Sequence, residues 1–274
     1  MTFTERLRSI EQAQNSLLCV GLDTDATKIP AFLSSHENPV AEFNRRIIEA
    51  TREFVCAYKI NLAFYEVLGP RMWDTLQRTL SFIPGDVITI GDAKRGDIGN
   101  SSSYYARVLF DELHFSAATL HPYMGFDSVE PFLRRRECGA FILTLTSNPG
   151  ARDFQYLRVN KRPLYEHVIR KVRGWNTEGN CGLVVGATRP GELKKIRDLV
   201  PSMPILIPGI GAQGGDLEKA VRHGCDRTGF SALVNASRTI IYASAGEDFA
   251  DAARRQALEM RDTINRSRER FFTP

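Results

Sequence analysis

The stretch VITIGDAKRGDIGNSSSYYA, residues 87–106, joins an apolar run to a set of closely spaced charges. Its apolar part, 87–90, is continuous rather than alternating, which is typical of a strand covered on both faces. The charges follow directly, at Asp92, Lys94 and Asp97, and a helix is expected after them. The stretch therefore predicts a strand–loop–helix unit with polar side chains at the carboxyl end of the strand.

Seven further apolar runs of this kind are spread along the chain, at residues 17–22, 54–60, 117–120, 140–145, 182–185, 205–207 and 231–234. Segments with helical periodicity lie between them, as in 39–54, where Val40, Phe43, Ile47 and Ile48 would share one helix face. A short helix is expected before the first run, at 3–14. Eight such units predict a (β/α)8 TIM barrel with a short N-terminal helix. An open, doubly wound sheet is the alternative.

Length and composition agree with a globular chain. The 274 residues are 43% hydrophobic and 25% charged, which excludes general disorder. No linker rich in Pro, Gly or Ser divides the sequence, so we expect one barrel domain over residues 1–274. The net charge of +4 is too small to indicate a nucleic-acid partner.

The sequence shows no signal for membrane insertion or secretion and no cysteine motif. No run of 18 apolar residues predicts a membrane helix, and the first residues lack the apolar region of a secretory signal. The five cysteines are an odd number, are widely spaced and include no C-x-x-C pair. We expect a cytoplasmic protein with no membrane partner, no disulfides and no zinc site.

The strongest chemical signal is a cluster of charges on the expected catalytic face, which the loops after the strands form in such barrels. Lys59 lies in the second run, and Asp92 and Lys94 follow the third, with Asp97 three residues further on. Charges at a strand end are costly to desolvate unless they are paired. The cluster is either a structural ion-pair network or catalytic, and its position favours catalysis.

Two loops further along the chain suggest a phosphate site. PGIGAQGGD, residues 208–216, follows the seventh run, and SRTIIYAS, residues 237–244, follows the eighth. These are the two loops that usually bind phosphate in TIM barrels. Glycines let backbone N–H groups approach phosphate oxygens, and Arg238 could add a bidentate contact. The alternative is two tight turns with an incidental arginine.

Four segments together carry a family resemblance: GDAKRGDIGNSSSYYA (91–106), YKINLAFYE (58–66), TSNPG (146–150) and GIGAQGGD (209–216). The chain resembles the longer bacterial subfamily of orotidine 5′-phosphate decarboxylases over nearly its whole length. The resemblance implies decarboxylation of orotidine 5′-phosphate to UMP and CO2, the last step of de novo pyrimidine biosynthesis. It also implies that the reaction uses no metal and no cofactor.

The resemblance further implies roles for single residues. The catalytic tetrad would be Lys59, Asp92, Lys94 and Asp97, with Lys94 as proton donor. Asp97 would enter the site of the other subunit in a homodimer, and Ser101 would present its hydroxyl across the same dimer. The other implied substrate contacts are Asp23 and Lys59 to the ribose, Ser147 and Pro208 to the pyrimidine, and Gln213 and Arg238 to the phosphate. His121 lies outside the pattern.

Three other functions stay open at this point. A magnesium-dependent sugar-phosphate decarboxylase or synthase shares the D-x-K-x-x-D spacing, but the strand ends supply no obvious extra acidic ligand. A Schiff-base aldolase needs a neutral lysine, which the paired aspartates disfavour. A catalytically silent protein that binds a phosphate ligand is the third, although all four charged residues of the tetrad are present.

Overall fold

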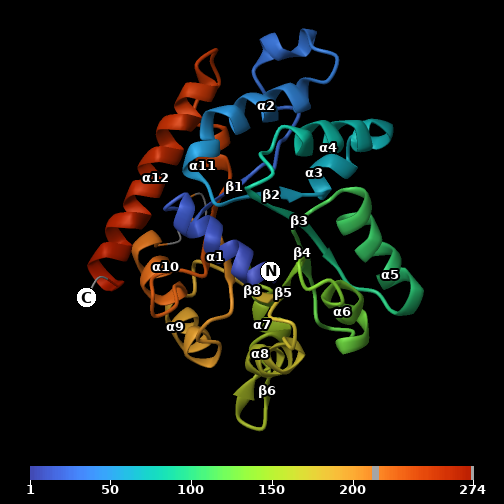
Figure 1. Ribbon diagram of the computed structural model, residues 1–274, viewed down its shortest axis with the longest axis vertical. Helices are drawn as coiled ribbons and strands as arrows, with labels where there is room; N and C mark the ends of the chain where they lie inside the picture. Colours follow the sequence, from blue (N-terminus) through green and yellow to red (C-terminus); the bar gives the residue numbers. More distant parts are fainter. Residues whose placement is uncertain (212–215, 273–274) are drawn as a thin grey trace.

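Eight parallel strands close into a barrel in the computed structural model, which describes residues 1–211 and 216–272 (Figure 1). Around the barrel the strand order is β1-β10-β9-β8-β5-β4-β3-β2. The barrel strands are β1 (Leu18–Gly21), β2 (Ala57–Asn61), β3 (Ile88–Arg95), β4 (Ala117–Leu120), β5 (Gly139–Leu145), β8 (Cys181–Val185), β9 (Ile205–Pro208) and β10 (Ala232–Ala236). Each coincides with one of the eight apolar runs, so the predicted TIM barrel is confirmed.

Helices alternate with the strands and surround the barrel (Figure 1). They are α2 (Pro39–Thr51), α3 (Ala63–Glu66), α4 (Met72–Ser81), α5 (Gly99–Arg107), α6 (Phe126–Leu133), α7 (Ala151–Phe154), α8 (Leu164–Trp175), α9 (Pro190–Leu199), α10 (Leu217–Gly224), α11 (Arg238–Ile241) and α12 (Phe249–Phe272). In α2, the predicted apolar face of Val40, Phe43, Ile47 and Ile48 is buried. Asn38 caps this helix by accepting the Ala41 N–H at 3.1 Å.

Two features of the fold differ from the sequence prediction. Residues Arg52–Phe54 form a 3-10 turn, so β2 begins three residues later than the apolar run does. A small antiparallel hairpin, β6 (Arg158–Val159) and β7 (Arg162–Pro163), stands outside the barrel between β5 and α8 (Figure 1). Its strands are two residues long, and a run that short has no period that a sequence pattern could reveal.

Helix α1 (Phe3–Ala13) closes the amino-terminal end of the barrel. Its apolar residues Phe3, Leu7 and Ile10 form one cluster with the side chains that fill the barrel interior. The Phe3 ring packs edge-on against Phe141 with 5.8 Å between centroids. A side chain at Gly139 would place its Cβ 2.5 Å from the Phe3 ring, so this close approach requires glycine. The barrel is therefore open at the carboxyl end of its strands alone.

Two smaller findings concern the whole chain. None of the described helices combines the length and the apolar character that crossing a membrane requires. All five cysteines are free thiols. Four of them are buried, and a reduced cysteine in such a place packs as a small apolar side chain.

Glu11 is a buried carboxyl group on the inner side of α1. It is fully buried, and its Oε2 accepts the Ser231 N–H at 3.1 Å. Its Oε1 has no hydrogen-bond partner among the described residues. Burial raises the pKa of Glu11 to about 7, against the opposing effect of the Ser231 N–H and the nearby Arg8. The folded chain therefore holds a proton here that the unfolded chain releases near pH 4.5.

This difference predicts how stability changes with pH. Between the unfolded pKa and about pH 7, the folded state binds the extra proton, so the free energy of unfolding falls as pH rises. Glu11→Gln removes this effect. We compare the unfolding free energy of this variant with that of the unmodified chain. The difference should be about 2–3 kcal/mol more favourable to the variant at pH 8 than at pH 5, since one pKa unit corresponds to about 1.4 kcal/mol.

Urea unfolding at the two pH values measures this gain. Glu259→Gln, at an exposed position of α12, is the control and should change with pH as the unmodified chain does. If the unfolding free energies of Glu11→Gln and the unmodified chain differ by the same amount at pH 5 and pH 8, Glu11 is not protonated in the folded state.

Candidate active site

Strand β3 carries the central part of the site and does so through an irregularity. It pairs with β4 in register up to Gly91, and pairing resumes only at Arg95, so a bulge lies between them. Within this bulge, Lys94 adopts a left-handed backbone conformation with φ of 46°. Residues other than glycine rarely adopt it, and such strain concentrates at functional sites. The bulge brings the Lys94 side chain back beside Asp92.

Four charged side chains form a continuous chain of ion pairs at the carboxyl ends of β1, β2 and β3. Lys59 Nζ lies 2.9 Å from Asp23 Oδ1 and 3.0 Å from Asp92 Oδ2. Asp92 Oδ1 in turn lies 2.7 Å from Lys94 Nζ. Asp23 is held from its other side by Ser237, whose hydroxyl donates to Oδ2 at 2.9 Å. The charges thus alternate in the order Asp23, Lys59, Asp92, Lys94.

The members of this series of ion pairs differ in their exposure to solvent. Lys59 and Asp92 are buried, with 3% and 8% of their surface exposed, whereas the Lys94 side chain is 47% exposed. Burial would raise the pKa of Asp92, but Lys59 and Lys94 hold it well below its ordinary value. Burial would likewise lower the pKa of Lys59, but Asp23 and Asp92 raise it above its ordinary value. The buried ammonium and carboxylate groups therefore favour each other's charged forms, and Lys94 presents its ammonium group at the open end of the series.

A cavity of about 420 Å³ lies over these charges. Lys59, Asp92 and Lys94 line one side of it. The residues that line the rest are Leu143, Leu145, Thr146, Ser147, Asn148, Val184, Gly186, Thr188, Leu206 and Pro208. The cavity thus combines an apolar wall with a charged wall, and it includes the predicted contacts Ser147 and Pro208. A side chain at Gly186 would overlap Ser147 Oγ, so glycine keeps this wall open.

The two loops predicted to bind phosphate approach each other closely. Gly211, with φ of 77°, comes so near the β10–α11 loop that a Cβ there would lie 2.7 Å from Thr239 Cγ2. Arg238 begins α11 directly beside this contact and is exposed. The predicted contact Gln213 lies outside the described residues.

Asp97 and Ser101 stand apart from the ion pairs. Asp97 lies after β3, and its Oδ1 accepts the N–H of Ile98 at 2.8 Å. Within the described ranges it makes no ion pair, so the structure brings together three members of the predicted tetrad and leaves the fourth separate. Ser101 is exposed on α5. Neither residue lines the cavity of its own chain.

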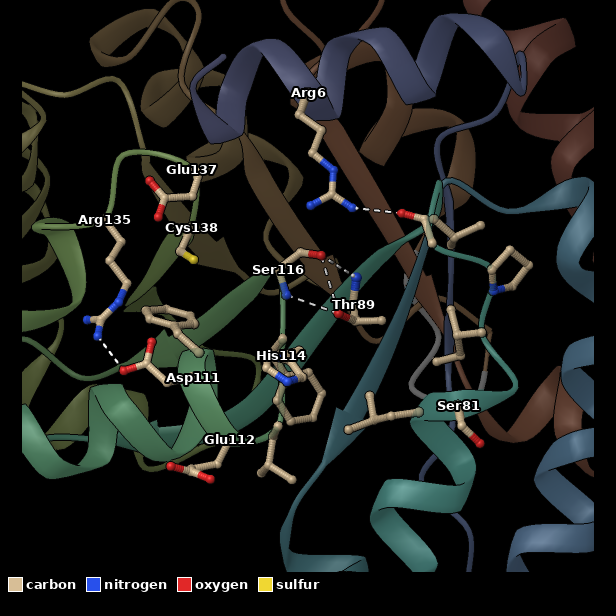
Figure 2. A pocket seen from close by; sticks show the side chains of 18 of the residues that line it. Arg6, Ser81, Thr89, Asp111, Glu112, His114, Ser116, Arg135, Glu137 and Cys138 are labelled. Atoms are coloured by element: carbon tan, nitrogen blue, oxygen red, sulfur yellow. Dashed lines mark hydrogen bonds and ion pairs between the residues drawn. The ribbon is translucent and has the colours of Figure 1, made fainter.

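The largest described cavity does not lie beside the buried charges but at the opposite end of the barrel. A larger cavity, about 690 Å³, lies at the amino ends of β3 and β4, beneath Arg6 of α1 (Figure 2). Four of its polar residues pair with one another: Arg135 pairs with Asp111 at 2.6 Å, and Ser116 exchanges hydrogen bonds with Thr89. The carboxyl-end cavity is smaller but holds the chain of buried charges, and perturbed ionisable groups in a cleft are the better marker of a functional site.

Sequence analysis missed two polar side chains that belong to this region. Thr119 of β4 donates to Asp92 Oδ1 at 2.7 Å and is buried. Asn235 of β10 is buried, and its Oδ1 has no partner within the part of the chain that the structure describes. Thr119 lies inside the run 117–120, which was interpreted only as apolar, and Asn235 directly follows the run 231–234. Strand alternation could have found them, because each is two residues after a side chain of the barrel interior, Ala117 or Leu233.

A metal centre would need several ligating side chains close together. Among residues 1–211 and 216–272, no three His, Cys, Asp or Glu side chains lie together as metal ligands would. His121, which falls outside the family pattern, follows β4 and packs so tightly against Gly96 that a Cβ there would overlap its ring. It therefore fills space beside β3.

Comparison with known proteins gives a consistent result. A family model described as "Orotidine 5′-phosphate decarboxylase / HUMPS family" matches residues 16–255. An orotidine 5′-phosphate decarboxylase of Dehalococcoides mccartyi is 52% identical, over 99% of this chain and 100% of its own. One from Ralstonia pickettii is 47% identical, over 98% of this chain and 100% of its own.

Solved structures agree with the sequence relatives. The structure of OMP decarboxylase from Leishmania donovani has a TM-score of 0.87 and 38% identity, covering 98% of this chain and 99% of that one. The match of the family model over most of the chain and the full-length relatives together settle the relationship. The chain belongs to the orotidine 5′-phosphate decarboxylase / HUMPS family.

Proposed function

We propose that the chain is a carboxy-lyase that converts orotidine 5′-phosphate to UMP and CO2, the last step of UMP synthesis. The observation that carries the proposal is the alternating chain Asp23, Lys59, Asp92, Lys94, which ends in an exposed ammonium group at the cavity. The relatives that are 47–52% identical over nearly the full chain bear the name of this activity.

The reaction needs a fixed positive charge beside the reacting carbon. When CO2 leaves, the electron pair of the broken bond stays on a ring carbon, in the plane of the ring, where the ring cannot easily delocalise it. A preorganised cation is the natural means of stabilising such a charge. The Lys94 ammonium group supplies it and then donates a proton to the carbon, so that the C–C bond is replaced by a C–H bond.

The buried residues hold the Lys94 ammonium group in place. Asp92 stays ionised because the Lys59 ammonium group is buried beside it, and its other oxygen lies 2.7 Å from Lys94 Nζ. A Schiff-base aldolase would need the opposite, a neutral lysine nucleophile. The same geometry thus supports proton donation and argues against the aldolase.

The remaining cavity residues support recognition of a nucleotide. Asp23 and Lys59 would contact the ribose hydroxyls, Ser147 the pyrimidine, and Pro208 would pack near the base. Lys59, Ser147 and Pro208 line the cavity, and Asp23 contacts Lys59. Arg238, and Gln213 outside the described residues, would bind the phosphate. Because the phosphate is remote from the reacting carbon, its binding energy can be used to position the ring and to exclude water.

The homodimer is part of the same proposal. Asp97 and Ser101 do not line the cavity of their own chain, which is expected if they serve the partner's site. The loops and helices that follow the neighbouring strands β3, β4 and β5 also expose large apolar side chains: Ile98, Tyr104, Tyr123, Met124, Phe126, Phe154 and Leu157. Apolar surface of this kind commonly marks an interface between proteins.

The magnesium-dependent sugar-phosphate enzyme that the sequence left open differs from this proposal in its need for a metal ion. The decisive experiment is the loss of orotidine 5′-phosphate absorbance with purified protein, with and without EDTA. Turnover that EDTA leaves unchanged supports the proposal. No turnover of orotidine 5′-phosphate, or turnover that EDTA abolishes, would contradict it.

Lys94→Ala tests the proton donor. It should lower kcat on orotidine 5′-phosphate by about 1,000-fold or more, because both the stabilising charge and the proton are lost. Lys171→Ala, at an exposed position of α8, is the matched control and should keep normal kcat. Near-normal turnover in folded Lys94→Ala would rule out this role.

Arg238→Ala tests the phosphate contact. Loss of one charged hydrogen-bonding group should raise KM about 10- to 100-fold, with a smaller effect on kcat. Binding of orotidine, which lacks the phosphate, is the control and should not change. If Arg238→Ala weakens orotidine binding as much as it weakens orotidine 5′-phosphate binding, Arg238 does not contact the phosphate.

A mixture of two inactive variants tests the shared site. In a hybrid of Asp97→Ala and Lys94→Ala subunits, one of the two sites would contain both intact side chains. Equal amounts should recover about one quarter of the normal activity if subunits exchange freely, because half of the dimers are hybrids with one good site each. Demonstrated exchange without recovery would show that Asp97 acts within its own chain.

A further inference from the structure

Lys94 depends on an unusual backbone arrangement to reach Asp92. Its left-handed φ of 46° lies within the bulge, where residues 92–94 stand opposite the single residue Thr119. The register around it is Gly91 with Ala118 and Arg95 with Leu120. The bulge therefore removes the Lys94 N–H from the regular hydrogen bonds between the strands, and another acceptor has to replace them.

The Thr119 side chain supplies that acceptor. The Lys94 N–H donates to Thr119 Oγ1 at 3.0 Å. The same hydroxyl donates its proton to Asp92 Oδ1 at 2.7 Å. The directions are fixed, because an ionised carboxylate can only accept and a backbone N–H can only donate. Thr119 is 1% exposed, so water cannot replace either bond.

These contacts close a ring around the lysine. Asp92 Oδ1 receives both the Thr119 hydroxyl and, at 2.7 Å, the Lys94 ammonium group. One hydroxyl therefore ties the backbone of Lys94 to the carboxylate that holds the tip of its side chain. Half of the Lys94 side chain is exposed, and the residue contacts no other carboxylate within the described ranges, so this ring fixes its position.

We propose that Thr119 is a positioning residue for Lys94, which rests on the function proposed above. Thr119 does not line the cavity, so it acts through Lys94 and Asp92 and not on the substrate. Without its hydroxyl, the strained backbone of Lys94 loses its hydrogen bond, and Asp92 loses one of the donors that set its orientation. The ammonium group then lies away from the reacting carbon in part of the molecules.

Thr119→Val removes the hydroxyl and keeps the shape of the side chain. It should lower kcat about 10- to 100-fold, the cost of a misplacement of roughly 1 Å. KM should stay within about twofold, because the groups that bind the ribose and phosphate are untouched. Thr119→Ser keeps the hydroxyl and should restore most of kcat.

Thr144→Val is the matched control. Thr144 is equally buried in the neighbouring strand β5, but its hydroxyl donates only to the Ile142 carbonyl, at 2.9 Å. A loss of kcat in Thr119→Val that exceeds the loss in Thr144→Val, at a similar melting temperature, supports positioning. Equal losses in the two variants, or a Thr119→Ser variant as slow as Thr119→Val, would overturn it.

A crystal structure of Thr119→Val gives a readout that does not depend on the substrate. We expect Lys94 to leave the left-handed region or its Nζ to move away from Asp92. An unchanged Lys94 would overturn the proposal even if the enzyme acted on a different phosphate ester. If Thr119→Val does not fold, the smaller Thr119→Ala replaces it, and its kcat is compared with that of Thr119→Ser.

Discussion

The buried ammonium group of Lys59 is the constraint around which the site is organised. An unpaired charge at this depth would be prohibitively costly, and Lys59 is accommodated because two carboxylates contact it, Asp23 from one neighbouring strand end and Asp92 from the other. Each carboxylate then has a free oxygen to hold a further group, Ser237 or Lys94. The exposed lysine of the proposed mechanism is therefore the last member of a series that begins in the core.

The barrel makes this arrangement possible through strand register. Lys59 pairs in register with Gly21 on one side and with Ile90 on the other, two residues before Asp92. The regular alternation of strand side chains places Lys59 and Asp92 in the barrel interior. A second charged side chain of β3 has to turn back to contact Asp92. The bulge at Lys94 allows this, at the cost of backbone strain that Thr119 offsets.

The barrel strands and the position of the charged residues were predictable from the sequence. The contacts that were not predictable share one cause. The apolar runs located all eight barrel strands, because strands buried on both faces must be apolar. The spacing of Asp92 and Lys94 placed both at one strand end. The bulge and the hydrogen bonds of Thr119 were not predicted, because they depend on which residue stands opposite which across two strands. The Phe3 and Glu11 contacts of α1 escaped for the same reason, since they join residues more than a hundred positions apart.

The closure of the barrel floor by α1 has a consequence for the traffic of molecules through the site. Phe3, Leu7 and Ile10 fill the amino-terminal end together with the interior side chains, so the barrel is a blind well and not a channel. Whatever is formed beside Lys94 leaves by the mouth through which the substrate entered. Because the Lys94 side chain is half exposed, both products form close to that single mouth.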